Sequence, residues 1–438
     1  MPDFNPAKRP GALHQLLSRA IEVRPTEVRA LGWSWLYIFS VLSAYYILRP
    51  IRDEMGVAGG VENLQWLFTG TLIGMLAVNP PFAALVAKLP RVKFIAFTYR
   101  FFAVNLLIFI GLLAVAPGDL NIWIGRVFFI WASVFNLFVV SVFWALIVDV
   151  FDSEQGKRLF GFIAAGATLG GIVGSGVTAL LAKHMAATYL LLGSVLLLEV
   201  AVFCVKRLSA LSEALQRAPG AAPAEALIGG SIFSGLTHAL KTPYLINVSL
   251  FLLLFAMTST FLYFQQAEIA RTSFSSRGAR TAFFARVDLF VNVLTLGAQL
   301  FLTGRTLKRI GVGLTLAILP VMSIVGFATL AWLPTITALV AIQVTRRAGN
   351  YAFARPSREV LFTVVPREDK YKAKSFIDTV VYRFGDQVGA WSYAGLGALG
   401  LAMTGISLVA VPISLAWLLN SLWLGRKQKG LEAQPSAG

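Results

Sequence analysis

Four charged residues lie at the end of the first long apolar run of the chain, in the stretch Tyr45–Gly56. They are Arg49, Arg52, Asp53 and Glu54. An apolar run of about 20 residues can cross a bilayer, and ionisable groups inside one usually face a protein interior or a water-filled cavity. We therefore expect Arg49 to face a cavity, where its guanidinium can bind an anion. Asp53 and Glu54 either face the protein interior or such a cavity, or they end the helix in the headgroup layer.

The overall composition indicates an integral membrane protein with many spans. Of 438 residues, 57% are hydrophobic and 13% are charged, whereas soluble domains are about a quarter charged. The formal net charge of +17 would suggest nucleic acid as the partner of a soluble protein. Here it is better explained by Lys and Arg on cytoplasmic loops, which orient the spans and lie against anionic membrane lipid. We expect no nucleic-acid partner.

Cysteine and histidine are scarce in this chain, with one and three residues. Cys204 is the single cysteine, which excludes an intramolecular disulfide, and the three histidines are far apart in the sequence. No nucleotide loop, metal motif or His/Cys/Ser constellation appears, so we expect no cofactor, no metal and no enzymatic activity. No apolar core precedes a cleavage site near the N-terminus, so we expect no removable signal peptide.

Apolar windows of about 19 residues predict an all-α, polytopic membrane protein of about twelve transmembrane helices. The expected spans are 30–50, 65–87, 94–116, 122–149, 159–182, 186–205, 244–267, 282–303, 312–332, 335–364, 375–400 and 404–424. Two parallel six-helix halves joined by a basic linker are typical of the major facilitator fold. The predicted divisions are an N-terminal segment 1–28, a first half 29–206, a linker 207–243, a second half 244–425 and a tail 426–438.

Basic residues gather in every second loop and in the tail, as the positive-inside rule requires of cytoplasmic segments. This pattern predicts that both termini are cytoplasmic and that the protein lies in a bacterial-type inner (plasma) membrane. One loop does not fit. Between the seventh and eighth spans, Arg271, Arg277 and Arg280 stand against Glu268 alone on the opposite side.

Three glycines recur every four residues in the fifth span, at Gly166, Gly170 and Gly174. They share one helix face, and small residues at this spacing let a neighbouring helix approach closely. This face is either a sliding surface between the two halves or a site of static, tight packing.

Arginines outnumber carboxylates among the ionisable groups in or near the spans, which favours an anionic substrate because a guanidinium fork suits phosphate and carboxylate. We also expect many of these charges to pair with one another. In the eleventh span, Asp378 and Asp386 lie near one helix face, and Arg383 precedes Asp386 by three residues. A proton-coupling carboxylate and a salt-bridge gate both fit this pattern.

Several motifs resemble those of the ATP/ADP translocase-type family, the plastid and bacterial NTP/NDP exchangers. Residues 47–53, ILRPIRD, are similar to the end of that family's first span. Residues 149–159, DVFDSEQGKRL, followed by a glycine-rich span, resemble its fourth-to-fifth loop. Residues 356–359, the basic run 366–374 and residues 377–386 resemble its region around spans ten and eleven.

The resemblance implies a transporter of anionic solutes that binds nucleotide phosphates through lysines at two of these positions. Here one lysine is replaced by Arg52, which keeps the charge, and the other by Asp386, which reverses it. We assign substrate binding to Arg49, Arg52 and Arg383. We assign coupling or gating to Asp53, Asp149, Lys157, Arg158, Glu359, Asp378 and Asp386.

The sequence thus predicts a secondary transporter that moves an anionic solute, with nucleotide exchange as one version, by alternating access. One alternative is a proton-coupled major facilitator transporter of another small anion or amphiphile, with Asp386 carrying the proton. Another, from a different class, is a non-transporting membrane scaffold whose intramembrane charges are all paired. The sequence gives no oligomeric state.

Overall fold

A computed structural model describes residues 22–88, 91–151, 153–216, 237–366, 373–374 and 376–433. Side chains are described for all of these except residues 83, 84, 86–88, 91, 92, 153, 157 and 212–216. Across these ranges the regular structure is entirely helical. The all-α fold expected from the sequence is therefore confirmed.

The described chain crosses the bundle twelve times. Ten crossings are single α-helices, and two are made of shorter pieces that run on from one another. The single helices are α2 (Val28–Ala58), α3 (Leu64–Lys88), α4 (Arg91–Val115), α5 (Gly118–Val150), α6 (Ser153–Leu181), α7 (Ala187–Gln216), α9 (Pro243–Ser273), α10 (Arg277–Phe301), α11 (Thr303–Trp332) and α16 (Met403–Glu432). The composite crossings are α12 (Ile336–Gly349), η2 (Asn350–Ala354) and α13 (Arg355–Leu361), and then η3 (Ile377–Val381) and α15 (Tyr382–Ala398).

Helices suit these segments because a backbone in lipid must satisfy its own hydrogen bonds. By length and composition, nine helices in the described part of the chain can cross a membrane on their own. Several helices of the second half begin at a capping side chain. Ser276 and Thr335 accept hydrogen bonds at 3.2 Å from the backbone N–H groups of Ala279 and Ala338, which satisfies donors that a helix start leaves free.

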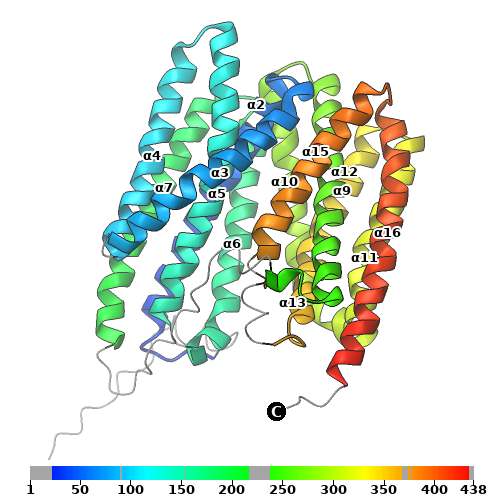
Figure 1. Cartoon of the computed structure of the whole chain (residues 1–438). Coiled ribbons are helices and arrows are strands. Elements are labelled where there is room, and N and C mark those ends of the chain that lie inside the picture. The colour runs from blue at the N-terminus through cyan, green and yellow to red at the C-terminus, as the bar shows by residue number, and fades with distance from the viewer. Residues whose placement is uncertain are drawn as a thin grey trace, which may run out of the picture.

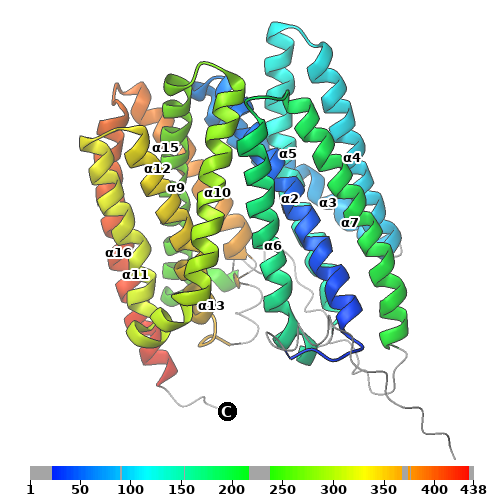
Figure 2. The same ribbon diagram turned by 180° about the vertical axis from the view of Figure 1, so that it is seen from behind.

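The helices form two bundles that stand side by side (Figure 1). α2 to α7 make the first bundle and α9 to α16 the second, and the view from behind shows the same division (Figure 2). We call the side at which α2 begins and α16 ends the terminal side, and the opposite side the distal side.

Among the described residues the first bundle has one apolar core and the second has two, and a fourth core joins the bundles. The first bundle packs aromatic side chains such as Phe128, Phe135 and Phe143. The joining core brings Phe129 of α5 together with Phe264 of α9 and Phe284 of α10. Because this core lies between the bundles, any change in their relative tilt must repack it.

Several helices extend beyond the predicted spans, α2, α7 and α16 among them. The first span was expected near 30–50, but α2 continues to Ala58, so Arg49 to Glu54 lie within the helix. The reason is that these charges find partners inside the protein and need not leave the membrane. The predicted linker 207–243 is partly helical, since α7 continues to Gln216. Residues 217–236 of that linker, 1–21 of the N-terminal segment and 434–438 of the tail lie outside the described residues.

Candidate functional site

α2 carries its charged turn into the interface between the two bundles. Arg49, Arg52, Asp53 and Glu54 all contact residues of other helices or one another there. The side chains of Asp53 and Glu54 are only 6% and 3% exposed. Of the two alternatives for these carboxylates, burial inside the protein is therefore the one observed.

At the centre of the interface, one carboxylate faces two arginines. Asp288 of α10 lies 3.3 Å from an Nη of Arg49 and 2.7 Å from an Nη of Arg347 on α12. Both contacts go to Oδ1, whereas the buried Oδ2 has no hydrogen-bond partner among the described residues. We call Arg49, Asp288 and Arg347 the central cluster. It joins the two halves and has one more cation than anions.

Beside the central cluster, Arg52 lies against its neighbour Asp53. Arg52 donates two hydrogen bonds to Asp53 Oδ1, at 3.0 and 2.6 Å, and a longer one of 3.4 Å to Ser133 Oγ. Its guanidinium stacks on Phe129 at 4.9 Å. Tyr263 of α9 donates to the same Asp53 oxygen at 3.0 Å, so this pair also links the halves.

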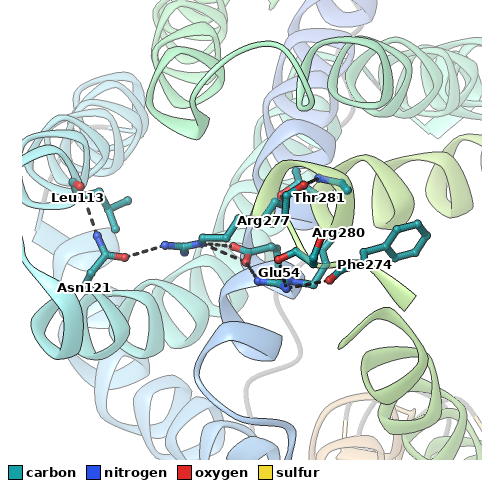
Figure 3. A network of polar contacts seen from close by, with 10 residues as sticks. Glu54, Leu113, Asn121, Phe274, Arg277, Arg280 and Thr281 are labelled. Atoms are coloured by element: carbon teal, nitrogen blue, oxygen red, sulfur yellow. Dashed lines mark hydrogen bonds and ion pairs between the residues drawn. The ribbon is translucent and has the colours of Figure 1, made fainter. Parts of the chain in front are cut away.

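A second group of charges joins the halves at the distal side (Figure 3). Glu54 accepts from Arg277 Nε at 3.1 and 3.0 Å on its two oxygens, and from Arg280 at 3.0 Å. Arg277 also donates to Asn121 of α5 at 2.8 Å. We call Glu54, Asn121, Arg277 and Arg280 the distal cluster. The distal cluster accounts for the basic loop between the seventh and eighth predicted spans, which did not fit the positive-inside pattern. Two arginines of that loop, Arg277 and Arg280, pair with the buried Glu54.

Close backbone packing accompanies the distal cluster. A Cβ placed on Gly278 of α10 would lie 2.3 Å from the carbonyl oxygen of Ala182, which follows α6. A hollow of about 250 Å³ remains nearby, lined by residues that include Glu54, Arg277 and Thr281. The two halves are therefore in close contact at the distal side.

The predicted residues of the eleventh span pair within the second half. Arg358 of α13 lies 3.0 Å from Asp378 in η3. Arg383 contacts Asp386 at 3.2 Å, and Thr260 of α9 donates to the other Asp386 oxygen at 3.4 Å.

These pairs stand beside the two π-helical turns, η2 and η3, and such turns are frequent at functional sites. Glu359 forms an ion pair with Lys374 at the terminal side. We assigned Arg49 and Arg383 of this span to one substrate site, but in the described structure Arg49 pairs with Asp288 of α10, which also holds Arg347 of α12.

At the terminal side, Arg158 ties α6 to the start of α2. Arg158 and Gln155 donate to Glu27 at 2.9 and 3.0 Å. Burial raises the pKa of Glu27, but the hydrogen bonds from Arg158, the Arg24 N–H and Gln155 outweigh this and hold the pKa below its ordinary value. Asp149 lies exposed in the last turn of α5, and the side chain of Lys157 lies outside the described residues.

The three spaced glycines face α2 of their own half. Cβ atoms on Gly170 and Gly174 would come within 2.5 and 2.4 Å of the backbone oxygens of Phe39 and Ser43, and Gly166 lies against Trp35. The neighbouring Gly171 faces the other half instead, since its Cβ would meet Asn292 at 2.9 Å. The close approach at the three glycines is therefore packing within one half.

Sequence reasoning missed the partners that complete the site. Asp288 and Arg347 were recognisable as ionisable residues inside spans, but nothing in the sequence assigned either to Arg49. Arg346 was an equally good candidate. The side chain of Arg346 points away from Asp288, and its guanidinium donates hydrogen bonds to Thr258, Ser259 and Ser323. Among the described residues no group of three or more metal-binding side chains is found.

Two helical bundles with buried arginines and carboxylates between them define a polytopic secondary transporter. Comparison with known proteins identifies the family. The sequence profile of the Major Facilitator Superfamily matches residues 30–357, and the chain belongs to that superfamily.

The similar sequences include bacterial nucleotide carriers. The ADP,ATP carrier protein 1 of Chlamydia trachomatis is 21% identical over 45% of this chain and 42% of its own length. The carrier of the same name from Chlamydia muridarum is 22% identical over 47% of this chain and 45% of its own length. The aligned part is thus under half the length of these curated relatives.

Solved structures support the fold. A bacterial homologue of the human lysosomal transporter Spinster, in an inward-facing and unoccupied conformation, gives a TM-score of 0.61 at 13% identity over 93% of this chain and 99% of that one. The structure of the nucleoside transporter NupG gives a TM-score of 0.58 at 15% sequence identity, over 94% of this chain and 100% of that one. At these identities the likeness concerns the fold alone.

Proposed function

We propose that this transporter moves an anionic solute, which binds between Arg49 and Arg347. One observation carries the proposal. Two arginines from opposite halves converge on Asp288, and the cluster keeps an excess of positive charge in a buried position. A buried cation is costly unless an anion pairs with it, so the centre favours a second negative group.

The solute anion would compete with Asp288 for the two guanidiniums. Arg49 and Arg347 are 17% and 16% exposed, whereas Asp288 is 2% exposed, so the arginines are the accessible side of the cluster. A phosphate or carboxylate accepts paired N–H bonds from each arginine fork. Because the arginines belong to different halves, the bound anion would hold the halves together while they rock about it.

We infer that both termini are cytoplasmic and that the membrane is a bacterial-type inner (plasma) membrane. The distribution of basic loops supports this orientation, and pairing with Glu54 accounts for the distal arginines that opposed it. With the halves in contact at the distal side, the described state would admit solute from the cytoplasm.

Nucleotide exchange is the narrower form of the proposal. Its support is the likeness to the Chlamydia ADP,ATP carriers and the matching motifs. The state of Arg383 counts against nucleotide exchange, because the positive charge of this arginine is already paired with Asp386 at 3.2 Å. A site with that carboxylate suits a small anion better than a polyphosphate.

Uptake into proteoliposomes tests the proposal. Labelled phosphate, small carboxylates, ADP and ATP are offered to the unaltered protein and to Arg49→Ala and Arg347→Ala. Each variant is expected to lose at least about tenfold in affinity, since a hydrogen bond to a charged group contributes about 1.5–3 kcal/mol. Arg286→Ala is the matched control, because this arginine lies two residues from Asp288 yet is exposed on α10.

Other outcomes would identify the alternatives. Exchange of ADP for ATP would support the nucleotide form. Uptake that is driven by a pH gradient and lost in Asp386→Asn would favour proton coupling, for which the burial of Asp386 beside Thr260 is the supporting observation. If no solute moves and Arg49→Ala harms only folding, the protein is a scaffold and the proposal is wrong.

A further inference from the structure

An ion pair lies on the outer surface of the first bundle, away from the interface of the halves. Arg100 of α4 and Glu199 of α7 are 3.5 Å apart, and their side chains are 52% and 47% exposed. The surrounding surface is apolar, with Phe97, Phe101 and Val104 each more than half exposed. Such a surface faces lipid in a membrane protein, where exposed charges are rare and usually functional.

The depth of this pair follows from the helix register. α4 and α7 pack antiparallel along one side of the bundle (Figures 1 and 2). Lys93 precedes Arg100 by seven residues, and Lys206 follows Glu199 by seven, so both lysines lie at one level toward the terminal side. At 1.5 Å per residue the ion pair is about 10 Å deeper than this basic level. If the lysines mark the headgroups, the pair lies in the hydrocarbon.

Arg100 is left with unused hydrogen-bond donors. A guanidinium has five N–H donors, and within the described structure Arg100 has only the 3.5 Å contact with Glu199. No water is available in the hydrocarbon region to satisfy the others. Acceptors from outside the chain are therefore needed, and the nearest ones are the phosphate and ester oxygens of a lipid at the headgroup level, toward which the long side chain of Arg100 can extend.

The surface around Arg100 is shaped and charged for such a lipid. An open hollow of about 530 Å³ runs along α4, lined by Lys93, Ala96, Phe97, Arg100, Phe101 and Val104. Lys206 and Arg207 are exposed on α7 about two turns beyond Glu199, and Arg207 stacks on Phe203 at 5.0 Å. Four cations thus meet a single carboxylate on this face. Basic pockets between transmembrane helices are typical sites for anionic headgroups.

We propose that the face formed by α4 and α7 binds an anionic phospholipid. Its phosphate contacts Lys93, Lys206 and the raised end of Arg100, because long basic side chains reach toward the headgroups. Its acyl chain lies along Phe97, Phe101 and Val104. Glu199 holds Arg100 at depth and competes with the lipid for it. This site is separate from the central cluster and does not depend on the proposed solute.

Native mass spectrometry of the detergent-purified full chain tests this site. Phosphatidylglycerol is titrated against phosphatidylcholine, and the bound lipid is counted per protein. We expect the anionic lipid to bind preferentially and Arg100→Gln to weaken its binding by about tenfold. Arg309→Gln is the matched control, because Arg309 is an exposed arginine at the terminal side of the other bundle. Equal lipid binding by the two variants would overturn the proposal.

A second variant keeps the test decisive if Arg100→Gln does not fold. Glu199→Gln removes the competitor, so we expect phosphatidylglycerol to bind about threefold more tightly and to raise the melting temperature more than in the unaltered protein. If Glu199→Gln only lowers stability and leaves lipid binding unchanged, the pair is structural and the proposal is wrong. Stabilisation by soluble glycerophosphate alone, or an Arg100-dependent dimer without lipid, would overturn it equally.

Discussion

The central and distal clusters are built from the same parts but are filled to different degrees. In each, one buried carboxylate meets two arginines at the interface of the halves; both arginines of Glu54 come from the opposite half, whereas only Arg49 reaches Asp288 from the opposite half. Glu54 uses both of its oxygens, and Arg277 is held further by Asn121. Asp288 uses only Oδ1, and its Oδ2 has no partner within the described residues. The carboxylate of the distal cluster is therefore bound through both oxygens and that of the central cluster through one, while each cluster keeps an arginine Nε, of Arg280 and of Arg49, without a partner among the described residues.

This difference suggests different roles. A carboxylate that arginines of the opposite half bind through both oxygens holds a conformation. A cluster whose carboxylate is bound through one oxygen, and whose two arginines lie on opposite halves, is suited to exchange one anion for another. The π-helical turn η2 strengthens this contrast, since it directly follows α12, which carries Arg347. No such turn interrupts α10, where Arg277 and Arg280 lie.

The largest expected effect comes from breaking the distal cluster with Glu54→Gln. Removing one partner from a buried ion pair costs about 3–5 kcal/mol, and Arg277 is 48% exposed, which favours the lower end. The halves should separate at the distal side. The measurement is thiol labelling of a Thr281→Cys reporter, buried beside Glu54, in a Cys204→Ala background. Labelling should become more than tenfold faster.

The control for this experiment is Glu268→Gln. Glu268 lies on the same distal side but pairs with Arg271 three residues away on its own helix, at 2.6 Å. Exposed pairs of this kind contribute only about 0.3–0.5 kcal/mol, so labelling should not change. Equal acceleration in both variants would mean that the distal cluster does not hold the halves together.

Asp288→Asn tests whether the central cluster exchanges anions. The amide leaves Arg49 and Arg347 without their internal anion, so an external anion should bind about tenfold more tightly, while turnover falls because release becomes slower. Equilibrium binding of the transported anion and the rate of exchange are measured side by side. Unchanged affinity would show that Asp288 does not occupy the solute's position.

A smaller effect is expected at Asp386. The loss of its charge in Asp386→Asn frees Arg383, which is 32% exposed and pairs with Asp386 at 3.2 Å. We expect multiply charged anions to bind about threefold more tightly, since part of the gain is screened by solvent. ADP and phosphate are compared as competitors of uptake. A gain for phosphate alone would exclude Arg383 from contact with a longer polyphosphate chain.

The fold could be predicted from the sequence because the length of an apolar segment and the charge of a loop are each visible in one short stretch of the chain. Which charged residues pair across the interface of the halves could not be predicted. Arg346 and Arg347 are neighbours and point about 100° apart on a helix, and only the packing of α12 decides that Arg347 faces Asp288. In the same way, the helical continuation of α2 past Arg49 depends on partners in α9 and α10, which lie more than 200 residues away in the sequence.

The last prediction concerns stability and not binding, at a carboxylate that an arginine of its own half holds. Glu27 resembles Glu54 in burial and pairing, but Arg158 and Gln155 belong to its own bundle. Its lowered pKa means that the folded state favours the charged form, so this stabilisation is complete above the ordinary glutamate pKa of about 4.3. It is lost as the pH falls through the lower pKa of the folded state.

The free energies of unfolding of the unaltered protein and of Glu27→Gln, taken from melting curves, should therefore differ by about 1 kcal/mol near neutral pH. They should converge in acid. Labelling of the Thr281→Cys reporter should stay constant throughout, because no contact of Glu27 crosses between the halves in the described structure. A reporter that responds to Glu27→Gln would show that the terminal side also controls the distal contact.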